Sequence, residues 1–339
     1  MRGDNLTHRN PLAGAPGLVG DIGGTNCRFA RATAGSPDLV SIVSRANADF
    51  AGPREAIQAY LAANPAQGRP QWAVLAAAGP VRANAVDLTN NTPWRIDGAA
   101  LARELGIAEV RICNDLAAVA AAVPSLTEAD LAPVGAPQAL KQELPIGVVG
   151  VGTGLGVSGV VFAETEMVIL AGEGGHTTFA PTDPLQRAIA DRLAPQFGRL
   201  SNERVLSGDG LHLLYGALAE IEGARAAAAS ARAVSEAAIG GDPLARRALA
   251  IFSEALGAFC GDLALTLGAG GLCLSGGMLK NMQDVFDAGA FRQGFEAKGR
   301  FADDLHAVPT WHVRHPQPAL LGAAMMAARL TNLPNVLRR

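Results

Sequence analysis

The pattern of apolar and polar positions predicts alternating strands and helices in the first third of the chain. Short apolar runs typical of strands occur at residues 17–20, 27–32, 71–78 and 110–113. Helices are predicted at residues 53–63, 98–105 and 116–123. Pro53 suits a first helical turn, while Asp97 can cap the second helix and Gly106 can end it. This alternation indicates an α/β domain with a mixed sheet.

A second unit with its own strands and helices is expected from about residue 130. Its predicted elements are a strand–turn–strand at 147–162, a strand at 167–170, a helical stretch at 185–239, a helix at 243–267, a strand at 272–274 and a last helix at 319–330. Along 243–267, apolar residues recur every three or four positions, so we expect one buried face. These residues are Leu249, Phe252, Leu256, Phe259, Leu263 and Leu267.

Residues 144–163 carry no charge over twenty positions, which meets the length test for a membrane span. Six of the twenty are glycine and much of the remainder is valine, a composition that disfavours a helix. We therefore expect two buried strands joined by a glycine turn, and no membrane contact. Residues 1–17 lack the apolar core of a signal peptide and are interpreted as a flexible arm.

Composition narrows the class of protein. The 339 residues are 49% apolar and 17% charged, enough for a large core and about two domains. The net charge of −3 lacks the basic excess of a nucleic-acid-binding protein. No two of the four cysteines have the spacing of a metal or redox motif, so we expect buried reduced thiols and a cytoplasmic protein.

Two glycine-rich turns between apolar strands are the first candidates for chemistry, at 21–26 and 150–156. Turns without bulky side chains expose backbone N–H groups to an anion, and Thr25 and Thr153 add hydroxyl donors. Two such turns facing one cleft can grip a polyphosphate, although each alone can be a plain hairpin. The chain has no Gly-Lys pair for a Walker A motif, and neither turn opens a helix as a Rossmann turn does. The repetition suggests two copies of one fold.

Several polar residues follow predicted strands. Asn114 and Asp115 stand at the carboxyl end of a strand, where open α/β sheets bind ligands. They can act simply as a helix cap, but a helix N-terminus also favours the ionised carboxylate that a general base needs. Glu173 and His176 share a polar turn, with no second histidine or cysteine cluster nearby to complete a metal site. Glu203 can be an ordinary carboxylate at a helix start.

Taken together, six motifs resemble the bacterial glucokinases of the hexokinase, actin and heat-shock ATPase superfamily. They are LVGDIGGTN at 18–26, ICND at 112–115, GVGTGLG at 150–156, GEGGH at 172–176, ERVLSG at 203–208 and SGG at 275–277. The motifs follow the family's order and span residues 18–325. The resemblance implies two actin-like, ribonuclease-H-like α/β domains with mixed sheets flanking a cleft. Domain bounds would be 18–126 plus 317–339 for the small domain and 127–316 for the large one.

By motif position, the resemblance also implies ATP-dependent phosphorylation of glucose at its 6-hydroxyl. Asp115 would be the general base and would bind the sugar together with Asn114, Glu173, His176 and Glu203. ATP, carrying Mg²⁺, would be held by Gly20, Asp21, Ile22, Gly23, Gly24, Thr25, Asn26, Gly152, Thr153, Gly154, Gly276 and Gly277. No protein ligand to the metal is implied. A homodimer is also expected.

Two departures qualify the resemblance. The related repressor and kinase family has a zinc-binding, cysteine-rich motif after its Glu-x-Gly-His, but no cysteine follows His176 here, which favours the zinc-free group. The loop 88–94 differs from the family's pattern, so we assign it no contacts.

Other functions stay open from the sequence. The chain can be a kinase for mannose, fructose or an amino sugar, or a sugar-sensing regulator, and the phosphoryl donor can be polyphosphate in place of ATP. Seventeen residues before the first strand are too few for a DNA-binding domain.

Overall fold

The computed structural model describes residues 14–88, 93–136, 139–141, 143–163, 167–282 and 284–328. Most of the expected N-terminal arm and residues 89–92 of the loop 88–94 lie outside the described residues. The chain divides into two compact units. Unit 1 comprises Met1–Ser125 and Pro316–Arg339, and unit 2 comprises Leu126–His315.

Unit 1 contains a mixed five-stranded sheet with the order β3-β2-β1-β4-β7. Its strands are β1 (Pro16–Ile22), β2 (Asn26–Thr33), β3 (Leu39–Ala46), β4 (Trp72–Ala77) and β7 (Glu109–Asn114). The first three form an antiparallel meander, whereas β1, β4 and β7 run parallel. A separate ribbon pairs β5 (Ala85–Asp87) with β6 (Arg95–Asp97).

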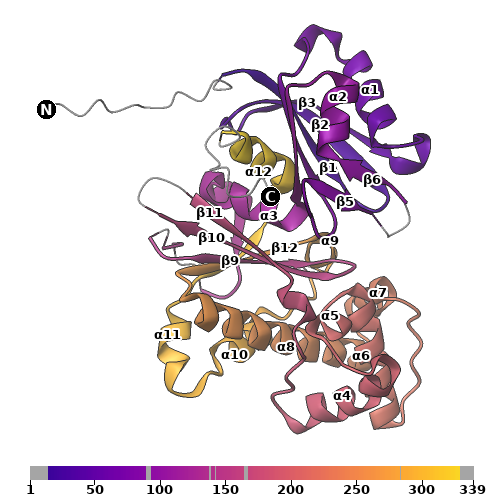
Figure 1. Cartoon of the computed structure of the whole chain (residues 1–339). Coiled ribbons are helices and arrows are strands. Elements are labelled where there is room, and N and C mark those ends of the chain that lie inside the picture. Colours follow the sequence, from indigo (N-terminus) through magenta and orange to yellow (C-terminus); the bar gives the residue numbers. More distant parts are fainter. Residues whose placement is uncertain are drawn as a thin grey trace, which may run out of the picture. The chain divides into compact units, whose positions relative to one another are not determined.

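Two pairs of helices accompany this sheet (Figure 1). The helices α1 (Pro53–Ala63) and α2 (Gly98–Leu105) share an apolar core with the strands, as Ile57 and Leu101 show. The helices α3 (Asp115–Ala122) and α12 (Pro318–Ala327) pack closely on each other. A Cβ added to Gly322 of α12 would lie 1.6 Å from the carbonyl oxygen of Ala118 in α3, so this crossing requires glycine.

Unit 2 contains a mixed six-stranded sheet with the order β11-β10-β9-β12-β13-β8. Its strands are β8 (Leu131–Pro133), β9 (Ile146–Val151), β10 (Leu155–Phe162), β11 (Met167–Gly172), β12 (Gly271–Ser275) and β13 (Thr310–Val313). Strands β9, β10 and β11 form an antiparallel meander, and β9, β12 and β13 run parallel. Five strands of each sheet thus follow the same topology, which confirms the expected repetition of one fold.

The longest helix of unit 2 is α8 (Pro243–Leu267) (Figure 1). The others are α4 (Pro184–Phe197), α5 (Asn202–Val205), α6 (Gly208–Glu222), α7 (Ala231–Ile239), α9 (Gly277–Asn281), α10 (Ala288–Glu296) and α11 (Ala302–His306). Of these, α6, α7, α10 and α11 pack against α8. By length and composition, α8 is the one helix in the described part of the chain that passes the test for a membrane span. However, 67% of its most apolar window is buried within the protein, as expected for a core helix.

Several predicted elements are confirmed and a few bounds are corrected. Helices α1, α2 and α8 have the predicted ends, and residues 144–163 form β9, β10 and their turn as expected. The prediction for the first hairpin was wrong at both ends of β1. This strand begins at Pro16, inside the expected arm, and it continues through Asp21 and Ile22, which had been assigned to the turn. The antiparallel pairing with β2 extends along the whole strand and explains the difference.

Candidate functional site

In unit 1, the parallel strands β1, β4 and β7 bring their carboxyl ends to one edge of the sheet. Asp21 of β1 is level with Ala76 of β4 and Cys113 of β7, and Ile22 is level with Ala77 and Asn114. The turn after β1 and the residues Asn114 and Asp115 after β7 therefore share this edge. It is the edge at which open α/β sheets bind their ligands.

The turn after β1 spans residues 23–26, the last of which begins β2, and Thr25 and Asn26 are exposed. The Gly23 N–H donates to the Asn26 carbonyl at 2.9 Å and closes the turn. Two further bonds come from Asn47, which lies 24 residues along the chain from Gly23. Gly20 and Ile22, which had been proposed to bind ATP, lie buried in β1 beneath this turn.

Asp21 lies next to the turn and faces Arg28 across the β1–β2 pair. The Nη1 atom of Arg28 is 3.1 Å from Oδ2 of Asp21. Burial raises the pKa of the Asp21 carboxyl, and the nearby positive charge and hydrogen bond of Arg28 oppose that rise. The glycine turn in this unit is therefore adjacent to a partly buried ion pair.

Asn114 and Asp115 have different roles at the start of α3. The Asn114 side-chain oxygen accepts from the N–H groups of Leu116 and Ala117, at 3.0 and 3.1 Å, so Asn114 is the helix cap. Its amide donates to the Gly79 carbonyl at 3.2 Å. Asp115 is the first helical residue, and its Oδ1 accepts from the Leu116 N–H at 2.9 Å. Asn114 is therefore the helix cap, and Asp115 places a carboxylate in the first turn of α3.

The buried thiol of Cys113 is close enough to this carboxylate and to Asp21 to respond to the charge of both. The pKa of Cys113 is raised to about 12, first by burial and then by the negative charges of Asp115 and Asp21. All four cysteines are free and buried, as predicted.

In unit 2, the second glycine turn joins β9 to β10 and is held by Glu203. The Gly152 N–H donates to the Gly154 carbonyl at 2.9 Å. Immediately after the turn, the Leu155 N–H donates to Oε2 of Glu203 at 3.0 Å. The Gly152 carbonyl accepts from the N–H of Gly208, the first residue of α6, at 2.8 Å. Residues about 50 positions apart thus converge on the turn.

The same carboxylate reaches the polar turn that follows β11. His176 ends a short 3₁₀ turn, with Nδ1 3.8 Å from Oε1 of Glu203 and Nε2 3.9 Å from Oε2 of Glu173. These separations are longer than hydrogen bonds, so the imidazole lies between two carboxylates without being tied to either. The side chains of Glu173 and His176 are 63% and 53% exposed, and that of Glu203 is 27% exposed. A Cβ at Gly175 would be 1.8 Å from the Leu155 carbonyl oxygen, so this close approach requires glycine.

Gly276 and Gly277 lie beside the second turn. Ser275 at the end of β12 is level with Gly150 of β9, and Gly276 follows with a φ of 116°. A Cβ at Gly276 would lie 2.1 Å from the Val151 carbonyl oxygen. Only glycine satisfies both the backbone angle and this contact. Gly277 begins α9 and has open space around it.

The structure therefore brings the predicted residues together as two groups, one in each unit. Unit 1 gathers Asp21, the turn 23–26, Asn114 and Asp115, and unit 2 gathers the turn 152–154, Glu173, His176, Glu203 and Gly276. Sequence reasoning missed Asn47, which bonds the first turn, and Arg199, which donates to the His176 carbonyl at 2.8 Å. Neither residue belongs to a motif, because each donates a hydrogen bond to a backbone carbonyl that is distant in the sequence.

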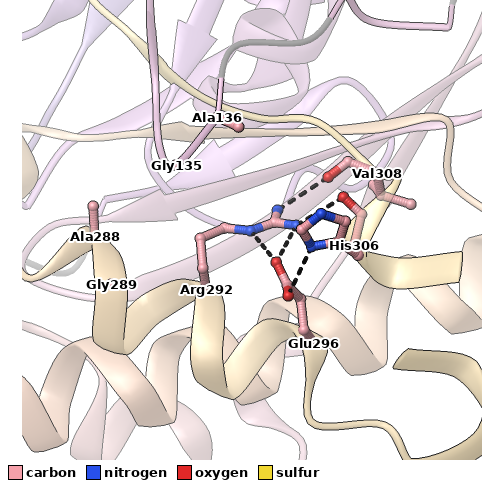
Figure 2. Close-up of a pocket in the computed structure, with 8 residues that line it drawn as sticks. All are labelled: Gly135, Ala136, Ala288, Gly289, Arg292, Glu296, His306 and Val308. Atoms are coloured by element: carbon pink, nitrogen blue, oxygen red, sulfur yellow. Dashed lines mark hydrogen bonds and ion pairs between the residues drawn. The ribbon is translucent and has the colours of Figure 1, made fainter. Parts of the chain in front are cut away.

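Among the residues that the structure describes, no three histidine, cysteine, aspartate or glutamate side chains gather as metal ligands do. A cavity of about 310 Å³ lies elsewhere in unit 2, between α10 and the segment after β8 (Figure 2). Gly135, Ala288, Arg292 and His306 are among its lining residues, and none of the predicted site residues lines it.

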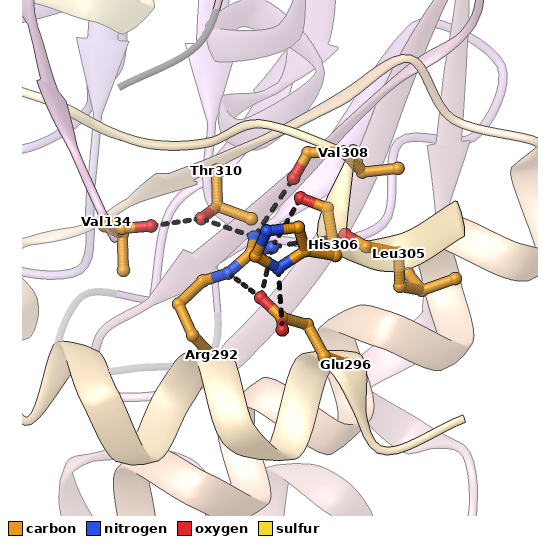
Figure 3. Close-up of polar contacts among 7 residues, drawn as sticks. All are labelled: Val134, Arg292, Glu296, Leu305, His306, Val308 and Thr310. Carbon is orange, nitrogen blue, oxygen red and sulfur yellow. Dashed lines mark hydrogen bonds and ion pairs between the residues drawn. The ribbon is translucent and has the colours of Figure 1, made fainter. Parts of the chain in front are cut away.

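The polar side of this cavity is a structural cluster centred on Arg292 (Figure 3). The guanidinium donates to Glu296 and to the carbonyls or hydroxyl of Leu305, His306, Val308 and Thr310. His306 Nδ1 lies 3.0 Å from Oε2 of Glu296. Arg292 therefore connects α10 to the end of α11, to Val308 and to the start of β13.

Comparison with known proteins identifies the family. The family model named Glucokinase matches residues 18–330. A glucokinase of Nitrobacter hamburgensis is 43% identical over 309 residues, which cover 91% of this chain and 95% of that protein. The crystal structure of a glucokinase from an Antarctic psychrotroph has a TM-score of 0.84 and 34% identity, covering 94% of this chain and 99% of that one. Glucokinase of Balamuthia mandrillaris, solved in complex with glucose, shares the fold, with a TM-score of 0.74, 19% identity and coverage of 93% and 94%. This chain belongs to the glucokinase family.

Proposed function

We propose that this chain transfers the γ-phosphoryl group of ATP to the 6-hydroxyl of glucose. The observation that carries the proposal is the family match along residues 18–330, with relatives named glucokinases that are 40–43% identical over 91% of the chain. The protein is thus an ATP-dependent glucose kinase. Which residues perform each step is our proposal, supported by the two groups of site residues described above.

Asp115 is proposed as the general base. Its position at the N-terminus of α3 favours the ionised form of its carboxylate. The carboxylate would accept the proton of the 6-hydroxyl while that oxygen bonds to the γ-phosphorus and the bond from phosphorus to the β-phosphate oxygen breaks, releasing ADP. Asn114, Glu173, His176 and Glu203 are proposed to hold the sugar hydroxyls.

The two glycine turns are proposed to hold the ATP phosphates. In unit 1, the turn 23–26 suits this role because Thr25 and Asn26 are exposed, and Asp21 lies beside the turn. In unit 2, Gly152, Thr153 and Gly154 are the proposed donors, with Gly276 and Gly277 bordering the adenosine. Gly20 and Ile22 are buried in β1, next to the first turn, and are proposed to hold that turn in place. Glycine turns suit phosphates because oxygen atoms can approach their backbone N–H groups closely.

Mg²⁺ is proposed to arrive bound to ATP. This ion retains several water ligands and is usually bound through substrate phosphates and one or two carboxylates, so it needs no dedicated protein cage. It would neutralise charge on the β- and γ-phosphates. Chelation with EDTA should abolish activity, and Mg²⁺ alone should restore it fully. Activity that survives chelation would contradict this part of the proposal.

The two units are proposed to be the two domains of the kinase. One carries Asp115 and the turn 23–26, and the other carries the turn 152–154, Glu173, His176 and Glu203. A homodimer in the cytoplasm is proposed from the resemblance of the motifs. Size-exclusion chromatography with light scattering tests the oligomeric state.

An assay of ADP release over a panel of hexoses tests the proposed substrate. Glucose should give the highest kcat/KM, and the product should be oxidised by glucose 6-phosphate dehydrogenase. Mannose, fructose and N-acetylated amino sugars are the competing substrates. A higher kcat/KM for one of these, or equal rates with polyphosphate as donor, would overturn the assignment.

A further inference from the structure

Asn47 is a buried polar residue that bonds twice to the first glycine turn. It begins a short 3₁₀ turn, Asn47–Asp49, directly after β3, and it is 1% exposed. Its side-chain Nδ2 donates to the Gly23 carbonyl at 2.8 Å. Its backbone N–H donates to the Thr25 carbonyl, also at 2.8 Å. One residue therefore fixes two carbonyl groups of one short turn.

The direction of these carbonyl groups matters for any anion at the turn. Carbonyl oxygens carry partial negative charge and repel phosphate oxygens, whereas backbone N–H groups attract them. Because both carbonyls accept hydrogen bonds from Asn47, their oxygen atoms point toward Asn47. The Gly23 N–H is directed across the turn to Asn26. These three hydrogen bonds hold the turn in the conformation seen here.

The second glycine turn is held in a comparable way by a different group. There the Gly152 carbonyl accepts from the backbone N–H of Gly208 at 2.8 Å, without any side-chain amide. A carbonyl of each proposed phosphate turn is therefore bonded to a donor from a later segment of the same unit. In unit 1, only the side-chain bond of Asn47 depends on the identity of the residue.

We propose that Asn47 is a positioning residue that orients the turn 23–26 for the phosphates of ATP. Asn47 itself contacts no substrate, and it acts by keeping the Gly23 carbonyl directed away from the phosphates. The inference rests on the proposed function of this turn. A residue with this role should affect affinity for the phosphate groups and leave affinity for glucose and for adenosine unchanged.

Two variants of Asn47 and one matched control test the inference. Asn47→Ala removes the side-chain donor, while Asn47→Asp preserves the shape but places carboxylate oxygens against the Gly23 carbonyl. The KM for ATP should rise about 3- to 10-fold in Asn47→Ala, the range expected for one net hydrogen bond, and more in Asn47→Asp. The KM for glucose and the dissociation constant of adenosine should change less than about twofold. The control is Asn64→Asp, which removes a 2.8 Å bond to the Tyr60 carbonyl in the same unit and should leave all three constants unchanged.

The outcomes separate this inference from the proposed function. Wild-type protein without ATP-dependent glucose phosphorylation would contradict the proposed function itself. Active wild type with an unchanged ATP KM in both Asn47 variants would overturn the role of Asn47 alone. Equal losses for ATP, adenosine and glucose, or failure of both variants to fold, would show that Asn47 only stabilises unit 1, and would also overturn it.

Discussion

Variants of Glu203 and His176 distinguish the two contacts that the Glu203 carboxylate makes in unit 2. One oxygen accepts from the Leu155 N–H at 3.0 Å, next to the turn 152–154, and the other lies 3.8 Å from His176. Glu203→Ala removes both contacts, whereas His176→Ala leaves the bond to Leu155 in place. We therefore expect Glu203→Ala to lower the affinity for both glucose and ATP, and His176→Ala to lower the affinity for glucose only.

The size of the effect on ATP follows from the bond to Leu155. Hydrogen bonds to charged groups contribute about 1.5–3 kcal/mol, and partial exposure of Glu203 places this one at the lower end. If all of that energy serves to order the turn, Glu203→Ala raises the dissociation constant of ATP about tenfold. Glu203→Gln keeps an oxygen that can accept from Leu155, so its loss of ATP affinity should be about threefold or less. In both Glu203 variants, kcat/KM for glucose should fall about tenfold or more, because the charged partner proposed for a sugar hydroxyl is lost.

Isothermal titration of ATP alone, combined with steady-state kinetics in glucose, separates these effects. Removing the partner hydroxyl from glucose should lower kcat/KM less in the variants than in the wild-type protein. Deoxy-glucose analogues measure this decrease. If Glu203→Ala leaves ATP affinity unchanged, the bond to Leu155 does not order the turn. If His176→Ala weakens ATP and glucose equally, His176 maintains the fold and does not bind the sugar.

Three further predictions concern other parts of the two units. Gly276→Ala should lower the melting temperature and the affinity for ATP, because its Cβ would collide with the Val151 carbonyl at a φ of 116°. The control is Gly216→Ala in α6, where an added Cβ meets open space, and similar effects in both variants would contradict the reasoning. Burial alone would raise the pKa of Glu296, but hydrogen bonds from His306 and Arg292 hold it below its usual value. The unfolded carboxyl therefore binds protons at higher pH than the folded one, so this contribution to stability is present above about pH 4.3 and is lost as pH falls through the folded pKa. Urea unfolding of wild type and Glu296→Gln between pH 3 and 6 should show a smaller acid loss in the variant, and parallel curves would refute this. Thiol labelling of native protein at pH 8 should leave Cys113 unmodified, because its pKa is raised to about 12 and it is buried, whereas rapid labelling would contradict this.

Elements with local signals were predictable from the sequence. Helix α2 begins after Asp97, whose side chain accepts from the Ala100 N–H, and ends at Gly106 in the left-handed conformation. Both features are determined by residues within one turn of the helix ends. The glycine hairpins were predictable for the same reason, because glycine and apolar strands stand next to each other in the sequence.

Elements that depend on distant partners were not predicted. Strand β3 was missed because it lies at the edge of its sheet, where Val40 and Ile42 remain largely exposed. The helical stretch predicted at 185–239 is divided into four helices, with residues 223–230 outside them. Asn84 also gave no signal, although its amide donates to the Val110 carbonyl and its oxygen accepts from the Ile112 N–H, which completes the edge of β7.

The motifs predicted which residues to consider for the candidate site, but not their contacts. Glu203, Glu173 and His176 do lie close together, yet the bond between Glu203 and Leu155 joins residues 48 positions apart in the sequence. Asn47 belongs to no motif, and its proposed role follows only from its hydrogen bonds to the Gly23 and Thr25 carbonyls. Such contacts depend on the packing of whole units, which a single sequence does not specify locally.

The kcat of Asp115→Asn tests the central claim most directly. Asparagine preserves the size and much of the hydrogen bonding of Asp115 but accepts no proton from the sugar. With saturating ATP and glucose, we predict that kcat falls at least about 100-fold while the KM for glucose changes little. If the variant retains more than about a tenth of the wild-type kcat, Asp115 is only part of the start of α3, and the proposed mechanism is wrong.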